Sequence, residues 1–350
     1  MFEYVGAMHI HSDYSDGTGT IGDILRTAGE VHLDFVIITD HNTLRAKKEG
    51  CEKFYNKTLL VLGYEINDKE NKNHCLVLNT EETLSTRVPA AEYLKKIKSS
   101  GGLSIIAHPH EKRTAFKEHP PYPWTEWDNS DFDGIEIWNH MSEWMETLSE
   151  QNKYEHFVHP LRSLVSPARE TLQKWDELSL ERKVIGVGGT DAHAHKINLM
   201  GFFEVEVFPY KVLFKAIRTH ILAPKKMQIS ANSEGVQKAI KQVISAIKNG
   251  CCFVANDYIC NSFGFRFWAE SGDKQFEMGD TVNGTDSCKI CIDVPGVSPE
   301  VRIIRNGKII ETFTDNEIRV DMTEYGVYRV EVYMRDKAWI YSNHIRFENK

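Results

Sequence analysis

The sequence predicts an α/β protein in which a closed or nearly closed barrel of parallel strands is followed by a smaller all-β part. Up to about residue 195, short apolar runs alternate with polar clusters and helical stretches, which indicates parallel α/β architecture. His, Asp and Glu residues fall mostly at the carboxyl ends of these runs, the edge where barrels build their sites. A doubly wound sheet would gather them at a single switch point, so their spread over many strands favours the barrel.

Each predicted strand of this barrel is an apolar run that stops abruptly at polar residues. Tyr4–His11 ends in a His-Ile-His sequence, and Asp34–Thr39 is followed by an Asp-His pair. Between them, Thr20 and Asp23 form a capping pattern that predicts a helix opened by Thr20. Further strands are expected at 59–63, 73–79, 103–107, 134–138 and 184–188, and further helices at 42–55, 90–97, 142–157 and 167–182.

The segment Glu111–Asp133 interrupts this alternation with prolines and aromatic residues in no clear period. A long segment of this kind inside a compact domain is often functional. We interpret it as a cover over the site that contributes an aromatic wall. The alternative is a surface excursion with a small apolar cluster of its own.

The composition changes after residue 201. Residues 236–247 form an amphipathic pattern closed by Gly250, and the stretch 203–250 is expected to be a largely helical connection. From residue 260 onward the sequence is almost entirely strand-like, with an Asn306-Gly307 hairpin pattern. We therefore expect a catalytic unit at 1–258 (core 1–225) and an immunoglobulin-like β-sandwich at 259–350.

Composition and net charge limit the classes of function that this chain can have. The chain has 350 residues, is 41% hydrophobic and 26% charged, and can therefore bury a sizeable core. A net charge of −8 argues against nucleic acid as the main partner, since phosphate backbones require a basic surface. The sequence contains neither an apolar run of about 18 residues nor a signal-peptide pattern, so we expect a cytoplasmic protein without a membrane partner.

The polar residues at the strand ends are of the kinds that bind metals. His9 and His11 are two residues apart on a strand and face the same way, and Asp191 and His193 repeat that spacing. The complete set is too large for one cation and suits two or three, and mixed nitrogen and oxygen ligands favour zinc, manganese or iron. Its members are His9, His11, Asp16, His41, Glu65, His74, His108, Asp191 and His193.

These motifs resemble, in order, those of the PHP (polymerase and histidinol phosphatase) superfamily. The segments HIHSDYSDG, ITDHN, GYEI, NHCLVLN, IIAHPH, GIEIWN and GGTDAHAH carry the resemblance over residues 1–225. It implies a distorted (β/α)7 TIM-like barrel with a two- or three-metal site on its carboxyl face, and phosphoesterase chemistry. The family's ligands fall on the same nine residues. The strand-rich end of the chain resembles the sandwich appended to some bacterial PHP hydrolases.

The function expected from the sequence is metal-dependent hydrolysis of a phosphorylated small molecule, in which a hydroxide bridging two metals attacks phosphorus. His195 and His110 are candidates for the acid that protonates the leaving group, because each lies two residues beyond a ligand. Arg113 and Arg162 are candidates for binding the phosphate. Hydrolysis of a carbamate, carboxyl ester or amide, and a non-enzymatic binding module, remain open. Exonuclease action fits the acidic charge less well.

Overall fold

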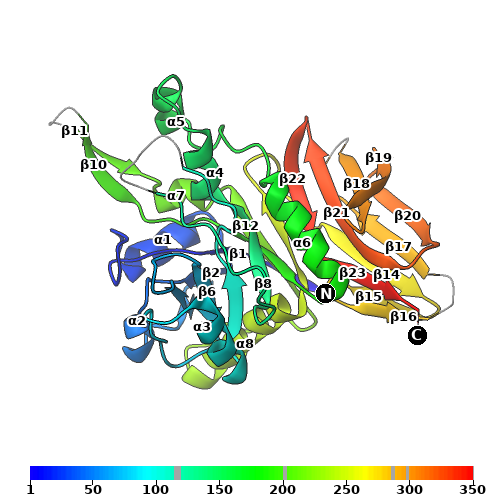
Figure 1. Cartoon of the computed structure of the whole chain (residues 1–350), viewed down its shortest axis with the longest axis horizontal. Helices are drawn as coiled ribbons and strands as arrows, with labels where there is room; N and C mark the ends of the chain where they lie inside the picture. Colours follow the sequence, from blue (N-terminus) through cyan, green and yellow to red (C-terminus); the bar gives the residue numbers. More distant parts are fainter. Residues whose placement is uncertain (114–119, 200–202, 285–287, 297–298, 350) are drawn as a thin grey trace.

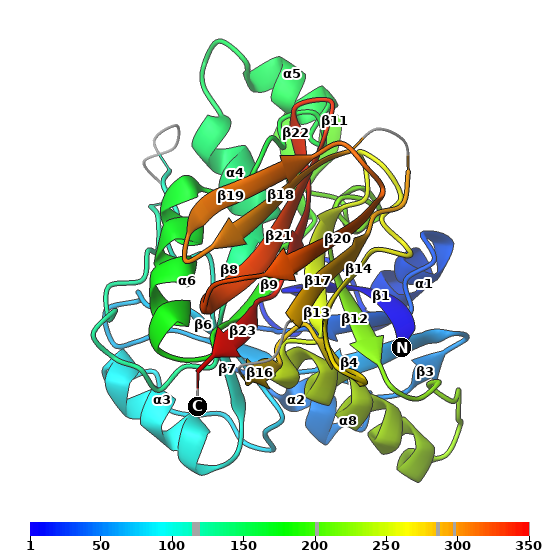
Figure 2. The same ribbon diagram turned by 90° about the vertical axis from the view of Figure 1, so that its right-hand side faces the viewer.

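The computed structural model describes residues 1–113, 120–199, 203–284, 288–296 and 299–349. Figure 1 shows a mixed α/β part, which contains the chain's first half, beside a part built almost entirely from strands. Figure 2, turned by 90°, shows the C-terminal strands in front of the α/β part. The α/β class predicted from the sequence is confirmed.

Parallel strands begin the α/β part. β1 (Phe2–Met8) pairs parallel with β2 (Phe35–Ile38), which pairs parallel with β4 (Thr58–Leu62). On its other side β1 pairs antiparallel with β12 (Ile217–Ala223), which pairs antiparallel with β13 (Cys252–Asn256). The buried apolar side chains of these strands explain why they lie at the centre of the sheet.

A second sheet of five strands faces this one. Its order is β5-β6-β7-β8-β9, antiparallel as far as β7 and parallel from β7 to β9. The strands are β5 (Tyr64–Ile66), β6 (Cys75–Leu78), β7 (Leu103–Ile106), β8 (Gly134–Asn139) and β9 (Ile185–Gly189).

Two isolated parallel bridges join the sheets at their carboxyl ends. One pairs Ile10 with Ala192, and the other pairs His41 with Glu65. In the described part of the chain, the ladders do not close into one continuous ring, and the expectation of wholly parallel pairing is wrong. The bridges nevertheless hold the two sets of strand ends together, which places their polar residues in one region.

The helices mostly follow the sequence pattern. α1 (Ile21–Glu30) begins after Thr20, whose hydroxyl accepts a hydrogen bond from the Asp23 backbone N–H, as predicted. The others are α2 (Arg45–Lys48), α3 (Ala90–Ser99), α4 (His140–Thr147), α5 (Lys153–Val158), α6 (Arg169–Glu181), α7 (Tyr210–Leu213) and α8 (Ser233–Asn249). Among the described residues, no helix has the length and apolar character needed to cross a membrane.

Two secondary-structure predictions are wrong. The helix expected through residue 55 ends after one turn, and β3 (Phe54–Tyr55) instead forms a hairpin with β4. The expected helical connection after residue 203 contains β11 (Phe203–Val207), paired antiparallel with β10 (His195–Leu199), and then β12. The alternation of apolar and acidic residues in FEVEV indicated a strand, because side chains of a strand point alternately to its two faces.

The C-terminal strands form two layers over a common core that includes Phe267, Ile290, Val332 and Trp339. One layer is the antiparallel sheet β15-β14-β17-β20: β15 (Lys274–Glu277), β14 (Arg266–Ser271), β17 (Cys288–Asp293) and β20 (Glu317–Met322). The other contains β16 (Thr281–Asn283), β18 (Glu300–Arg305), β19 (Lys308–Phe313), β21 (Gly326–Met334), β22 (Lys337–Ser342) and β23 (Ile345–Glu348). Because β22 pairs with β13, this second layer continues the sheet of the α/β part.

Candidate metal centre

The structure brings all nine predicted ligands together where the two sheets meet. Four overlapping sets of three or four of these residues have ligand atoms close enough together to surround a cation. The individual distances arrange the nine residues into three groups. Six of the nine residues follow the carboxyl end of a strand, Glu65 lies within β5, His74 immediately precedes β6, and Asp16 extends from the turn after β1. Residues far apart in the sequence, such as His9 and Asp191, are adjacent because the β1 and β9 ends are bridged.

The first group combines two imidazoles with two carboxylates. His9 Nε2 lies 3.1 Å from Glu65 Oε2 and 3.4 Å from Asp191 Oδ1. His11 Nε2 lies 3.2 Å and 3.5 Å from the same two oxygens. Ligands about 2.0 Å from one tetrahedral ion stand roughly 3.3 Å apart, so these four atoms have the spacing of one coordination shell.

The second group uses the other oxygen of Glu65. Its Oε1 lies 2.7 Å from His74 Nδ1 and 3.4 Å from His108 Nε2. The carboxylate of Glu65 therefore faces two sets of imidazoles, one with each oxygen. A carboxylate in this position can bridge two cations.

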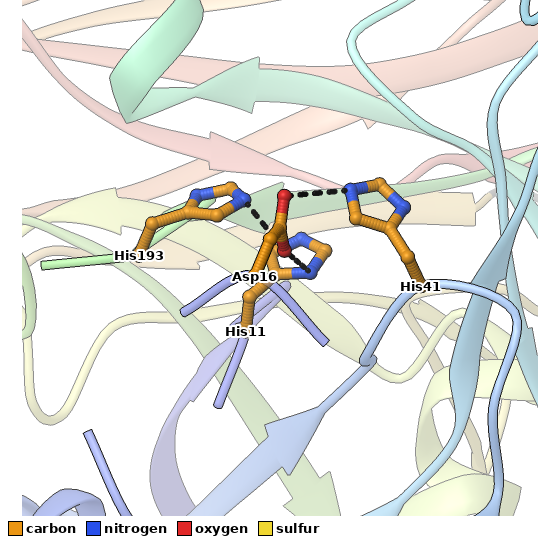
Figure 3. A group of neighbouring side chains, drawn as sticks. All are labelled: His11, Asp16, His41 and His193. Carbon is orange, nitrogen blue, oxygen red and sulfur yellow. Dashed lines mark ion pairs between the residues drawn. The ribbon is translucent and has the colours of Figure 1, made fainter. Parts of the chain in front are cut away.

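The third group surrounds Asp16 (Figure 3). Asp16 Oδ1 lies 3.5 Å from His193 Nε2 and 3.6 Å from His11 Nδ1, and Oδ2 lies 3.7 Å from His41 Nε2. The rings of His11 and His193 stack with centroids 4.1 Å apart. Asp16 is about half exposed, so this is the group nearest to solvent.

The buried atoms of the site fit cations. Both ring nitrogens of His11, Nε2 of His74 and Nδ1 of His108 have no hydrogen-bond partner among the described residues, although buried polar groups normally have one. Burial lowers the pKa of His11, but Asp191 and Glu65 outweigh it and raise that pKa to about 9. The same neighbours raise the pKa of His9 well above its ordinary value despite burial. The surroundings of His9 and His11 therefore favour positive charge, which bound divalent ions would provide, whereas burial lowers the pKa of His41 to about 4.

The backbone is strained at three of the ligands. His9, His108 and Asp191 have φ values of 59°, 28° and 53°, in the left-handed region that non-glycine residues rarely adopt. Such conformations cost on the order of 1–3 kcal/mol each and persist when surrounding contacts determine them. Here the Thr190 hydroxyl donates to the His9 carbonyl at 3.0 Å. These backbone conformations allow His9, His108 and Asp191 to direct their side chains into the site.

Several supporting residues were missed by the sequence analysis. Glu136 on β8 is buried, with Oε1 3.0 Å from His9 Nδ1, and its Oε2 accepts the His108 backbone N–H at 2.8 Å. Asp40 accepts the Ser12 backbone N–H and hydroxyl, both at 2.7 Å. The Tyr210 hydroxyl donates to the His11 carbonyl at 2.7 Å. Glu136 could have been found, because a carboxylate within the apolar run GIEIWN needs a buried partner.

A cavity of about 610 Å³ opens over the ligands. Of the predicted catalytic residues, His195 and Arg113 line it. The His195 ring stacks on His193 with centroids 4.9 Å apart. The Arg113 guanidinium is held by Glu111 Oε1, at 2.8 Å from Nε and 2.5 Å from Nη2.

His110 and Arg162 are not placed at this cavity. His110 Nδ1 lies 3.1 Å from the Thr171 hydroxyl, and its ring stacks on Trp127 beside a separate cavity of about 280 Å³. We expected His110 to face the same way as His108, as residues two apart do in an extended chain. It does not, because the positive φ of His108 turns the chain there. Arg162 is exposed and is not among the described residues that line the larger cavity.

The segment 111–133 has a mixed role. Tyr122 lines the larger cavity, and its ring stacks on His74 with centroids 4.9 Å apart. Trp124 is instead buried in the core of the α/β part. Phe116, with the rest of 114–119, lies outside the described residues.

Comparisons with known proteins identify a matching family and a relative of this chain. Residues 7–104 match the family model described as PHP domain. The uncharacterized protein MJ1587 of Methanocaldococcus jannaschii is 30% identical over 145 residues, which span 38% of this chain and 80% of the relative.

Two solved structures resemble the whole chain or most of it. A two-domain protein of Bacteroides vulgatus containing a predicted PHP-like metal-dependent phosphoesterase is 13% identical, with a TM-score of 0.44 over 98% of this chain and 95% of that one. PsfC of Pseudomonas syringae is also 13% identical, with a TM-score of 0.43 over 70% of this chain and 98% of that one.

Proposed function

The chain belongs to the PHP domain family, and from that premise we propose that it is a metal-dependent phosphoesterase acting on a small-molecule phosphate ester. The observation that carries the proposal is the position of Glu65, whose two oxygens face different sets of imidazoles. That arrangement would let Glu65 contribute to two neighbouring cation positions, and two divalent ions side by side can stabilise both the attacking and the leaving oxygen of a phosphoester.

Each group of ligands would hold one cation. On the distances between their atoms, His9, His11, Glu65 and Asp191 would form the first position, Glu65 with His74 and His108 the second, and Asp16 with His41 and His193 the third. When bound, divalent ions lower the pKa of water to near neutral and offset the charge of a phosphate ester. Three carboxylates against three divalent ions leave net positive charge, which suits an anionic substrate.

The remaining residues of the cavity would move protons and orient the ester. A ring nitrogen of His195 would donate a proton to the leaving oxygen, since this imidazole lines the cavity beside His193. Arg113, fixed by Glu111, would hold a phosphate oxygen. Glu136 would fix the orientation of the His9 ring through its contact with Nδ1, which leaves Nε2 directed at the other ligands.

The domain assignment is part of the proposal. We assign the chemistry to residues 1–258, as a distorted (β/α)7 barrel with its connecting elements. Residues 259–350 are assigned as a sandwich-like accessory unit without ligands of its own. The continuity of the sheet through β13 and β22 supports a fixed attachment between the two.

A substrate panel tests the proposed function. Purified protein loaded with Mn²⁺ or Zn²⁺ is assayed on p-nitrophenyl phosphate, bis-p-nitrophenyl phosphate, p-nitrophenyl acetate and an aryl carbamate. We expect turnover of a phosphate ester that Glu65→Gln abolishes and the surface variant Glu92→Gln retains. Turnover of the acetate or carbamate alone would replace the proposal with an acyl hydrolase. Stoichiometric metal without any turnover would replace it with a binding module.

A further inference from the structure

The cavity over the ligands has two unlike ends. One end is formed by the imidazoles and carboxylates of the candidate metal centre. The other is an apolar wall formed by Met141, Trp144, Met145, Phe157, Val207 and Phe208. Resting on the proposed function, we propose that the ester's alcohol portion is a bulky apolar group, aromatic or branched aliphatic, that packs against this wall.

The apolar wall is a packed surface drawn from three elements. On α4, Met141, Trp144 and Met145 lie three and four residues apart, so they share one face of the helix. The Trp144 ring packs edge-on against Phe157 on α5, with centroids 5.1 Å apart, and against Phe208 after β11, at 4.7 Å. The Trp144 indole N–H donates to the His156 carbonyl, so its polar group is already paired.

Backbone conformation supports a dedicated role for Phe208. Its φ is 56°, which is a rare conformation for a bulky aromatic residue and is costly unless the surroundings determine it. The conformation places a large ring in the wall immediately after the hairpin of β10 and β11. Core packing explains the buried Trp144 and Met145, but Met141 and Phe157 are only partly buried and face the cavity.

The charges around the cavity also favour an apolar alcohol over a second anion. Among the described residues lining it, the only Lys or Arg is Arg113, which is paired with Glu111 and is assigned to the single phosphate at the metals in the proposed function. Asn42, Asn67 and Asn71 are neutral. A substrate with several phosphates would therefore leave charges unpaired away from the metals. The volume of about 610 Å³ is typical of pockets that enclose a largely apolar small molecule.

The test compares two esters with equally poor leaving groups. Mn²⁺-loaded protein is assayed for phosphate release from ethyl phosphate and from 2-(1-naphthyl)ethyl phosphate. Because each buried methylene is worth about a fourfold change, we expect kcat/KM to be at least about 30-fold higher for the naphthyl ester. Phe157→Ser and Met141→Ser should each reduce that ratio several-fold. Val158→Ser is the matched control, since Val158 lies beside Phe157 but is 69% exposed.

A binding measurement separates failure of this inference from failure of the proposed function. Binding of 2-(1-naphthyl)ethanol to Zn²⁺-loaded protein is followed by isothermal titration calorimetry. Saturable binding that Phe157→Ser weakens and Val158→Ser retains supports the apolar subsite, even if neither ester is cleaved. Equal kcat/KM for the two esters, or alcohol binding that is absent or unaffected by Phe157→Ser and Met141→Ser, would overturn it.

Discussion

Single residues behind the ligands should determine how well the proposed site binds metal. Glu136 is fully buried and connects three parts of the centre, through the His9 ring, the His108 backbone N–H and the Asn139 side-chain amide. Partners of this kind fix the tautomer and the orientation of a ligating imidazole.

Replacing Glu136 by Gln should weaken metal binding by about 10–100-fold, because the amide orients the His9 ring less strongly than the carboxylate. Competition with a chromogenic chelator measures the affinity directly. The exposed Glu146→Gln serves as the control on α4 and should bind metal normally. Unchanged affinity in Glu136→Gln would show that the carboxylate does not support the site.

Replacing His195 by Ala should lower kcat by about 10²–10⁴-fold while metal content stays the same, because the change removes a proton donor rather than a ligand. Metal analysis and steady-state kinetics on the same preparation make the distinction. If the variant loses metal, His195 belongs to the ligand set. If kcat is unchanged, the leaving group takes its proton from elsewhere.

Among the elements, the turn after β1 determines where Asp16 lies. The Gly17 backbone N–H donates to the Ser12 carbonyl at 3.0 Å, and the Thr18 N–H donates to the His193 carbonyl at 2.9 Å. A Cβ on Gly17 would lie only 2.2 Å from the His11 carbonyl oxygen. The turn therefore requires glycine because its backbone approaches that of His11.

Gly17→Ala should displace the turn, lower the occupancy of the cation position at Asp16 and cost about 1–3 kcal/mol of stability. Metal stoichiometry and urea unfolding measure the two effects. Gly22→Ala is the matched control: it lies on α1 with its nearest atom at 3.7 Å and should stabilise the helix by about 0.5–1 kcal/mol. Full metal occupancy in Gly17→Ala would contradict this account of the turn.

Sequence patterns predicted where strands end and which helix faces are buried. They predicted less well which strands pair and whether the pairs are parallel or antiparallel. The ligand residues were evident because polar side chains interrupt apolar runs, whereas Glu136 was hidden inside such a run. The prediction for His110 failed because a positive φ at His108 ends the alternation of an extended chain. The apolar wall depends on contacts between α4, α5 and the end of β11, which no local pattern encodes.

At the scale of the whole molecule, a buried ionic network joins α6 to the C-terminal strands. Arg329 on β21 donates to both carboxylate oxygens of Asp176 on α6, at 2.6 Å and 2.7 Å, and His344 lies 3.0 Å from the same carboxylate. Burial raises the pKa of Asp176, but the hydrogen bonds from Arg329 and His344 outweigh it and lower the pKa to about 2.

Asp176→Asn should cost about 1.5–3 kcal/mol of stability near pH 7, because it removes two charged hydrogen bonds from the buried guanidinium of Arg329 and leaves Glu331 as its carboxylate partner. A carboxyl group whose pKa is lowered by folding stabilises the fold at pH values above its ordinary pKa. That stabilisation is lost as the pH falls through the lowered pKa. The difference between wild type and variant should therefore shrink between about pH 4 and pH 2. Urea unfolding across this range measures it. Asp293 is partly exposed and paired with Arg319, so Asp293→Asn should cost about 0–1 kcal/mol.

We claim that the nine candidate ligands jointly bind the cations that hydrolyse a phosphate ester. The most direct measurement is metal content and phosphate-ester turnover on the same samples of wild type and Asp191→Ala. We expect two or three equivalents of divalent metal in wild type, and loss of metal and turnover together in the variant. Unchanged turnover in pure Asp191→Ala, or turnover by wild type stripped of metal, would contradict the claim.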